Sequence, residues 1–194
     1  MSMSMRCSAI GAAVLSGAVL LTPVFLQAQG AAEVFTATAS VKTAAGATAT
    51  APLELAITRK MPQGQAETLV NAFKTGGAAA FKKALAGVAP TGTVQIGTAA
   101  KVPTRLTIER VTGVGRLLTV VTDQPLLFLG ASLPGAKATA GYDFAVIDIE
   151  IDAKGSGSGT LAPAAKLRVN QQGALVVDDY GVEAVRLLSV KKTK

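Results

Sequence analysis

The sequence predicts a mainly β protein with one helical region (α+β). We expect an antiparallel β-meander of about nine strands that forms a barrel or a sandwich, with one helical hairpin inserted after the second strand. Three observations predict this class. Apolar and polar residues alternate over most of the chain, glycine and proline separate the alternating segments, and helical spacing is confined to about residues 63–87.

The first two strands are expected on either side of a short turn. Residues 34–42 alternate between apolar and mainly hydroxyl-bearing side chains, which is the period of a half-buried strand. Residues 53–57 place Leu53, Leu55 and Ile57 on one face. Ala45-Gly46 lies between the two segments, so they are expected to form a hairpin.

The period then changes to that of a helix. Met61-Pro62 opens this region, because proline suits the first turn of a helix. Leu69 and Phe73 belong to an apolar stripe, and Gly76-Gly77 interrupts it. A second short helix is predicted from Ala78 to Leu85, which gives a helical hairpin.

Short strands are expected again after Pro90. The clearest is Phe144–Asp152, in which Ala145, Ile147, Ile149 and Ile151 share one face. The stretch 155–159, Gly-Ser-Gly-Ser-Gly, is predicted to be a flexible turn. The other strands are expected near residues 94–96, 105–111, 117–122, 166–170, 174–177 and 184–190.

Residues 1–30 have the composition of a secretory signal peptide. Arg6 is the only charged residue before Glu33, and an apolar run extends from Ala9 to Leu26. Small residues then fit cleavage after Gly30 or Ala32. The alternative is an uncleaved anchor, because a membrane-spanning helix needs ~20 apolar residues. The small residues that follow the apolar run favour cleavage.

We therefore expect an exported single domain over residues 33–194, in the periplasm, at the cell surface or secreted, without a transmembrane anchor. Cleavage would remove Cys7, the only cysteine, and would lower the net charge from +7 to +6 with the loss of Arg6. The chain has no histidine and no tryptophan.

This composition excludes several function classes. Without histidine, a Ser-His-Asp triad cannot form. Without cysteine and histidine, zinc, copper and haem lose their usual ligands, so no metal of this kind and no cofactor are predicted. Nucleic acid is not expected as a partner, because the basic residues are scattered and only 4% of residues are aromatic.

A row of carboxylates is the sharpest candidate site. Asp148, Glu150 and Asp152 are spaced to project from one face of one strand, where oxygen ligands could hold a cation such as Ca²⁺. In the alternative interpretation, Lys166 and Arg168 of the next strand lie opposite them and form cross-strand ion pairs.

Facing carboxylates across a cleft are the requirement for a glycosidase-like enzyme. Glu109 and Asp123 lie near opposite ends of a predicted hairpin, and only the fold could bring them together.

Two loops are further candidates for binding. The irregular stretch 126–140 is long for a compact domain, and it carries Ser132. Asp178, Asp179 and Tyr180 form a second polar patch, for which an ordinary turn is the alternative.

These observations leave three functional hypotheses, with the oligomeric state open. The first is a non-enzymatic binding protein that holds a small apolar or amphiphilic ligand inside a barrel or sandwich. The second is a structural or interaction protein of the cell envelope, which contacts an anionic polymer, a membrane surface or a partner protein. The third is an enzyme that uses carboxylates. We expect a binder or scaffold rather than a catalyst.

Overall fold

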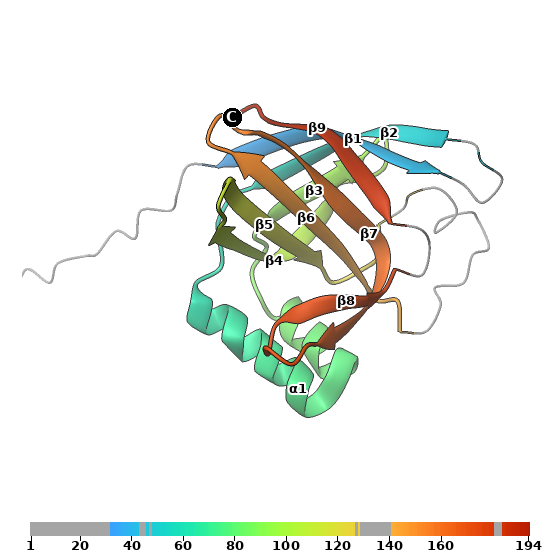
Figure 1. Ribbon diagram of the computed structural model, residues 1–194. Coiled ribbons are helices and arrows are strands. Elements are labelled where there is room, and N and C mark those ends of the chain that lie inside the picture. Colours follow the sequence, from blue (N-terminus) through green and yellow to red (C-terminus); the bar gives the residue numbers. More distant parts are fainter. Residues whose placement is uncertain (1–31, 43–45, 47, 127, 129–140, 181–183) are drawn as a thin grey trace, which may run out of the picture.

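The computed structural model describes residues 32–42, 46, 48–126, 128, 141–180 and 184–194. In this part of the chain, nine strands and one helix follow one another (Figure 1). They are β1 (Glu33–Lys42), β2 (Thr48–Ile57), α1 (Gln63–Ala86), β3 (Gly92–Ile96), β4 (Val102–Val111), β5 (Gly115–Thr122), β6 (Phe144–Asp152), β7 (Ser156–Val169), β8 (Leu175–Asp179) and β9 (Val185–Lys192).

The strands form a closed antiparallel barrel of eight strands with β8 as an extra strand. Strands β1 to β7 pair with their neighbours in chain order, and β9 closes the cylinder by pairing with both β7 and β1. Strand β8 pairs only with the end of β7. The mainly β fold, its antiparallel meander and the helical insert after the second strand are therefore confirmed, and the barrel is the correct one of the two predicted architectures.

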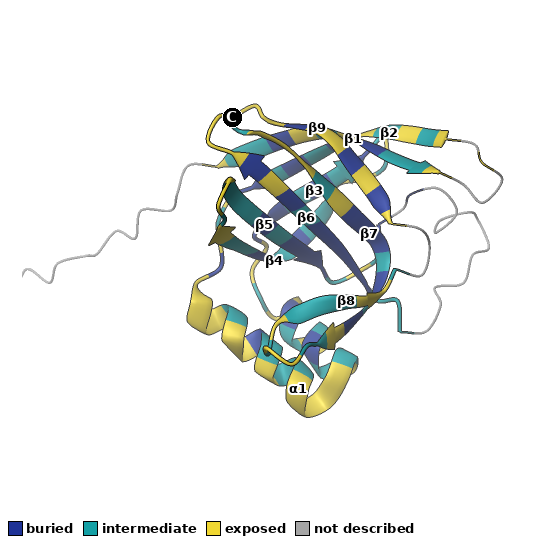
Figure 2. Cartoon of the chain, in the orientation of Figure 1, coloured by how far each residue is buried: buried dark blue, intermediate teal, exposed yellow. Residues whose placement is uncertain are grey.

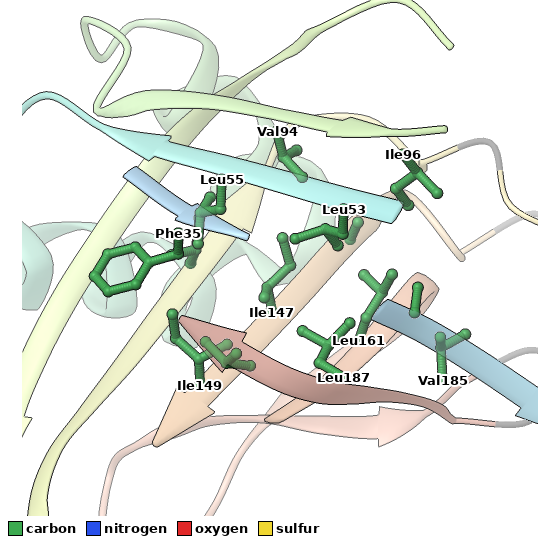
Figure 3. Packing of buried hydrophobic residues seen from close by; sticks show 14 of the residues in the cluster. Phe35, Leu53, Leu55, Val94, Ile96, Ile147, Ile149, Leu161, Val185 and Leu187 are labelled. Atoms are coloured by element: carbon green, nitrogen blue, oxygen red, sulfur yellow. The ribbon is translucent and has the colours of Figure 1, made fainter. Parts of the chain in front are cut away.

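The inside of the barrel is filled by apolar side chains from the strands (Figure 3). Ala145, Ile147, Ile149 and Ile151 of β6 all belong to this cluster and are at most 1% exposed, so their predicted common face is confirmed. Leu126 and Phe128 add to the cluster from beyond the end of β5. Contacts among these side chains, rather than a disulfide, hold the cylinder together.

Helix α1 covers the outside of the barrel and creates a second core. Phe81 packs edge-on against Phe144 of β6, with ring centroids 5.3 Å apart, and Leu69 and Leu85 are also buried. The outward faces of the helix are exposed (Figure 2). The two predicted helices are present as two helical segments of α1, and they meet at a kink at Gly77, whose φ of 66° suits glycine.

Two predictions around β7 need correction. The stretch 155–159 is not a flexible turn, and the strand expected near residues 166–170 begins about ten residues earlier, because β7 extends from Ser156 to Val169. Gly157 and Gly159 lie so close to β6 that a Cβ at either position would collide with the carbonyl oxygen of Glu150 or Asp148. Glycine here permits the close approach of two strands, which composition alone cannot distinguish from a loop.

No helix of the described residues combines the length and apolar character that a membrane crossing requires. Ser132 and the predicted signal peptide, residues 1–30, lie outside the described residues.

Candidate functional site

The carboxylate row points outward from β6, but Asp148 and Asp152 have other partners. The carboxylate of Asp148 accepts a hydrogen bond from the Thr119 hydroxyl at 2.5 Å. That of Asp152 accepts the backbone N–H groups of Lys154 and Ser156 at 2.8 and 2.9 Å, which fixes the turn between β6 and β7. Among the described residues, no group of three or more potential ligands could hold a metal ion.

The alternative prediction, in which Lys166 and Arg168 lie opposite the carboxylate row, is wrong. Thr160 and Ser158 lie opposite Asp148 and Glu150, because β7 starts about ten residues earlier than the sequence predicted. Burial raises the pKa of Asp148, and the Thr119 hydrogen bond and the charge of Arg110 only partly offset this. Asp148 is therefore a half-buried acid in a row of hydroxyl groups.

Lys166 and Arg168 lie instead beside β8, together with the polar patch predicted there. Arg168 pairs with Asp178 at 3.0 Å. Asp179 accepts a hydrogen bond from the Tyr142 hydroxyl at 2.5 Å, which raises the pKa of Tyr142. The Lys166 ammonium lies 4.6 Å from the centre of the Tyr142 ring. These contacts attach β8 to the barrel.

Tyr180 follows directly after β8. It is partly buried against the core beneath α1. Its neighbours Asp178 and Asp179 are engaged in the contacts described above. The polar patch therefore serves to attach β8 to the barrel.

The two acids considered for a facing pair have separate partners. Asp123 pairs with Arg105 at 2.9 Å, whereas Glu109 pairs with Lys60 and Arg116. The two carboxylates therefore do not form a facing pair. These two residues do not meet the requirement for glycosidase-like chemistry.

A network of charges that the sequence did not predict closes one end of the barrel. Glu33 begins β1, Glu109 lies near the end of β4, and Arg116 lies near the start of β5. Arg116 is paired in register with Ile151, and Glu109 with Leu118, both of which point into the barrel. The charged side chains therefore continue the inward faces of their strands beyond the apolar core.

Arg116 holds both carboxylates of this network. Its Nη2 and Nη1 atoms donate to the Oε1 and Oε2 atoms of Glu33 at 2.8 and 3.1 Å, and Nη1 also donates to Glu109 at 2.7 Å. Its guanidinium group lies 5.9 Å from the centre of the Phe35 ring. The planar guanidinium thus covers the last aromatic ring of the core while it bridges two strands.

Two lysines complete the network. Lys60 lies 2.5 Å from Glu109 and 3.6 Å from Glu33, and Lys192 lies 2.8 Å from Glu33. Burial would raise the pKa of Glu33, but hydrogen bonds from Arg116 and Lys192 and the charge of Lys60 outweigh it and lower the pKa to about 2. The pKa of Glu109 is lowered by Lys60 and Arg116 in the same way.

Both carboxylates are therefore ionised at neutral pH. A general acid needs a raised pKa, so this pair is suited to holding cations in place rather than to donating protons.

A hollow of about 580 Å³ opens over this network. Its charged lining consists of four basic and two acidic side chains, namely Arg116, Lys154, Lys192, Lys194, Glu109 and Asp152. We call this surface the basic mouth. Lys154 and Lys194 are exposed and form no ion pair with another described residue. Since Asp152 is occupied by backbone N–H groups, the mouth has positive charge available for an anionic group.

Sequence reasoning could have found one member of this network. Glu33 is in phase with Phe35, Ala37 and Ala39, so the alternation that predicted an inward apolar face also directs Glu33 inward. Its partners lie 83 residues away at Arg116 and 159 residues away at Lys192, and only closure of the barrel brings them together.

Comparisons with protein-family models, curated proteins and solved structures return no match for this chain.

Proposed function

We propose that this protein is an exported, non-enzymatic binding protein of the cell envelope, and that the basic mouth binds an anionic partner. The observation that carries the proposal is the 580 Å³ hollow, whose lining has an excess of two positive charges and two exposed lysines without ion pairs among the described residues. Export rests on the sequence of residues 1–30 and is part of the proposal.

The packing of the barrel favours a surface site over an interior one. The apolar side chains on the inward faces of β6 and β9 are at most 1% exposed and contact one another in a single cluster. The opposite mouth, which includes Val94, Ile96 and Leu126, has a mainly apolar hollow of about 270 Å³. This is below the ~300–1,000 Å³ typical of small-molecule sites, whereas the basic mouth lies within that range.

A groove between α1 and β4 is larger, about 710 Å³, but it lacks a charge preference. Lys74 and Arg110 supply two positive charges, and Glu67 and Glu109 supply two negative ones. An excess of one sign is what attracts a charged partner over distance, so the basic mouth supports a specific binding function better than this groove does.

Retention on an anionic polysaccharide matrix tests the proposal. The double variant K154Q/K194Q removes the two exposed lysines of the mouth, and K42Q/K83Q is the matched control with the same change in net charge. We expect the wild type to be retained at low salt and released at moderate salt, because exposed charges are screened within ~10 Å at about 0.1 M. The mouth variant should elute at distinctly lower salt than the control.

Two results would overturn the proposal. Equal shifts of both double variants would mean that only net charge matters and that the mouth is not a site. Retention that does not change with salt would exclude an electrostatic partner altogether.

A further inference from the structure

The hairpin between β4 and β5 exposes two valines at its tip. Val111 is 86% exposed and Val114 is 69% exposed, whereas Leu188 is the next most exposed large apolar residue of the described chain at 45%. The tip is an ordered turn, since the N–H of Thr112 donates to the carbonyl oxygen of Gly115 at 2.9 Å. A well-formed turn therefore presents two branched apolar side chains to solvent.

The hairpin tip reaches the edge of the basic mouth. Val111 lines the same hollow as Arg116, Lys154, Lys192 and Lys194. Arg110, which is exposed, directly precedes Val111 on β4. An apolar tip thus lies beside a hollow in which basic side chains outnumber acidic ones.

We propose that the anionic partner of the basic mouth is a lipid bilayer, and that Val111 and Val114 enter its interface while the surrounding lysines contact acidic headgroups. This inference rests on the proposed function and names its partner. Apolar side chains at a membrane interface leave water, and each nearby Lys or Arg adds attraction to anionic lipid.

The two valines favour a membrane over an anionic polymer. An anionic polysaccharide is bound mainly through hydrogen bonds and charges, to which a valine side chain contributes little. A lipid interface instead offers the tip an apolar environment a few ångströms beneath the headgroups that would contact Lys154 and Lys194. An apolar tip beside basic side chains therefore suits a membrane surface better than it suits a polymer.

A fluorophore at the tip tests the insertion directly. The full chain is labelled at V114C in a C7S background, and T98C in the turn between β3 and β4 is the control on the opposite end of the barrel. Each is mixed with phosphatidylcholine vesicles that contain or lack phosphatidylglycerol. We expect the emission of the V114C label to shift to the blue only with the anionic vesicles, and the T98C label to stay unchanged.

Residues 9–26 precede Glu33, which lies at the same end of the barrel as the V114C label, so the vesicles that lack phosphatidylglycerol are the control for that apolar run. A blue shift of the V114C label with both kinds of vesicle would mean that the apolar run alone brings the label to the membrane, and it would overturn the insertion. Equal responses of the two labels, or no response of the V114C label, would overturn the insertion.

Unlabelled variants measure the contributions to vesicle binding. V111S/V114S should weaken binding to the anionic vesicles about tenfold if each valine buries half of its side chain, and the matched variant L188S should leave it unchanged. K154Q/K194Q should weaken it about 25-fold, or about fivefold for each lysine. An unchanged midpoint of urea unfolding will show that these exposed substitutions leave the fold intact.

The outcomes separate this inference from the function on which it rests. If K154Q/K194Q weakens vesicle binding but V111S/V114S does not, the basic mouth binds anions and the insertion is wrong. If the protein is retained on the polysaccharide through the mouth and ignores anionic vesicles, the partner is a polymer and the insertion is again wrong. If neither surface is bound through the mouth, both proposals fail.

Discussion

The charge network at the barrel mouth makes a quantitative prediction about acid stability. Glu33 is held by Arg116, Lys60 and Lys192, and its side chain is only 12% exposed. The substitution Glu33→Gln keeps the shape of the side chain and removes its charge. It leaves Lys192 without its partner and makes Glu109 the remaining carboxylate for Lys60 and Arg116, so we expect the folded state to lose stability at neutral pH.

The magnitude follows from the pKa of Glu33. A fall from 4.5 to about 2 corresponds to about 3 kcal/mol as an upper limit. Water reaches Lys60 and Lys192, whose side chains are 41% and 37% exposed, and this screening lowers the expected loss to about 1–2 kcal/mol. Because the pKa is lower in the folded state, this stabilisation is present above pH 4.5 and disappears as the pH falls towards 2.

Urea unfolding at about pH 7 and about pH 2.5 measures this effect. The variant should be less stable than the wild type at the higher pH and nearly equal to it at the lower. Glu54→Gln is the control, because Glu54 forms one exposed ion pair with Lys101 and should contribute at most about 0.5 kcal/mol. The same loss at both pH values, or no greater loss than for Glu54→Gln, would refute the reasoning.

Three further predictions concern the described barrel. Because burial raises the pKa of Asp148, D148N should stabilise the fold at neutral pH, and urea unfolding should show this gain vanish as the pH falls below 3.8. L187A should cost about 2–5 kcal/mol because Leu187 is fully buried in the barrel, whereas L188A on the outer wall should change the unfolding free energy far less. G157A should cost at least about 1–3 kcal/mol and shift backbone amide signals of β6, because its Cβ would lie 1.8 Å from a carbonyl oxygen, whereas G113A meets nothing within 4 Å and should melt like the wild type.

The alternating pattern predicted much of the barrel because each strand buries one face. In β6 the pattern is clear, since Ile147, Ile149 and Ile151 alternate with Asp148 and Glu150 and the isoleucines lie inside the cylinder. The same logic failed at Gly157 and Gly159, which give no side chain to alternate. There the close contact with β6, not hydrophobicity, selects the residue type.

The candidate site was less predictable than the fold. The carboxylates of β6 were found because they lie on one strand, but their partners depended on where β7 begins. The charge network that includes Glu33, Glu109 and Arg116 comes from four strands and from the segment that leads into α1. Local patterns specify the direction of Glu33, whereas its encounter with Arg116 and Lys192 depends on which strands become neighbours when the cylinder closes.

The position of β9 determines the order in which the molecule can be completed. This strand is the last in the described chain, yet it lies between β1 and β7 and hydrogen-bonds to both. Until β9 takes its place, β1 has a pairing partner on one side only and its other edge is free. Because contacts between strands so distant in sequence form slowly, we expect closure of the cylinder to be a late step of folding. The pairing of β9 thus also removes an edge at which two copies of the open sheet could join.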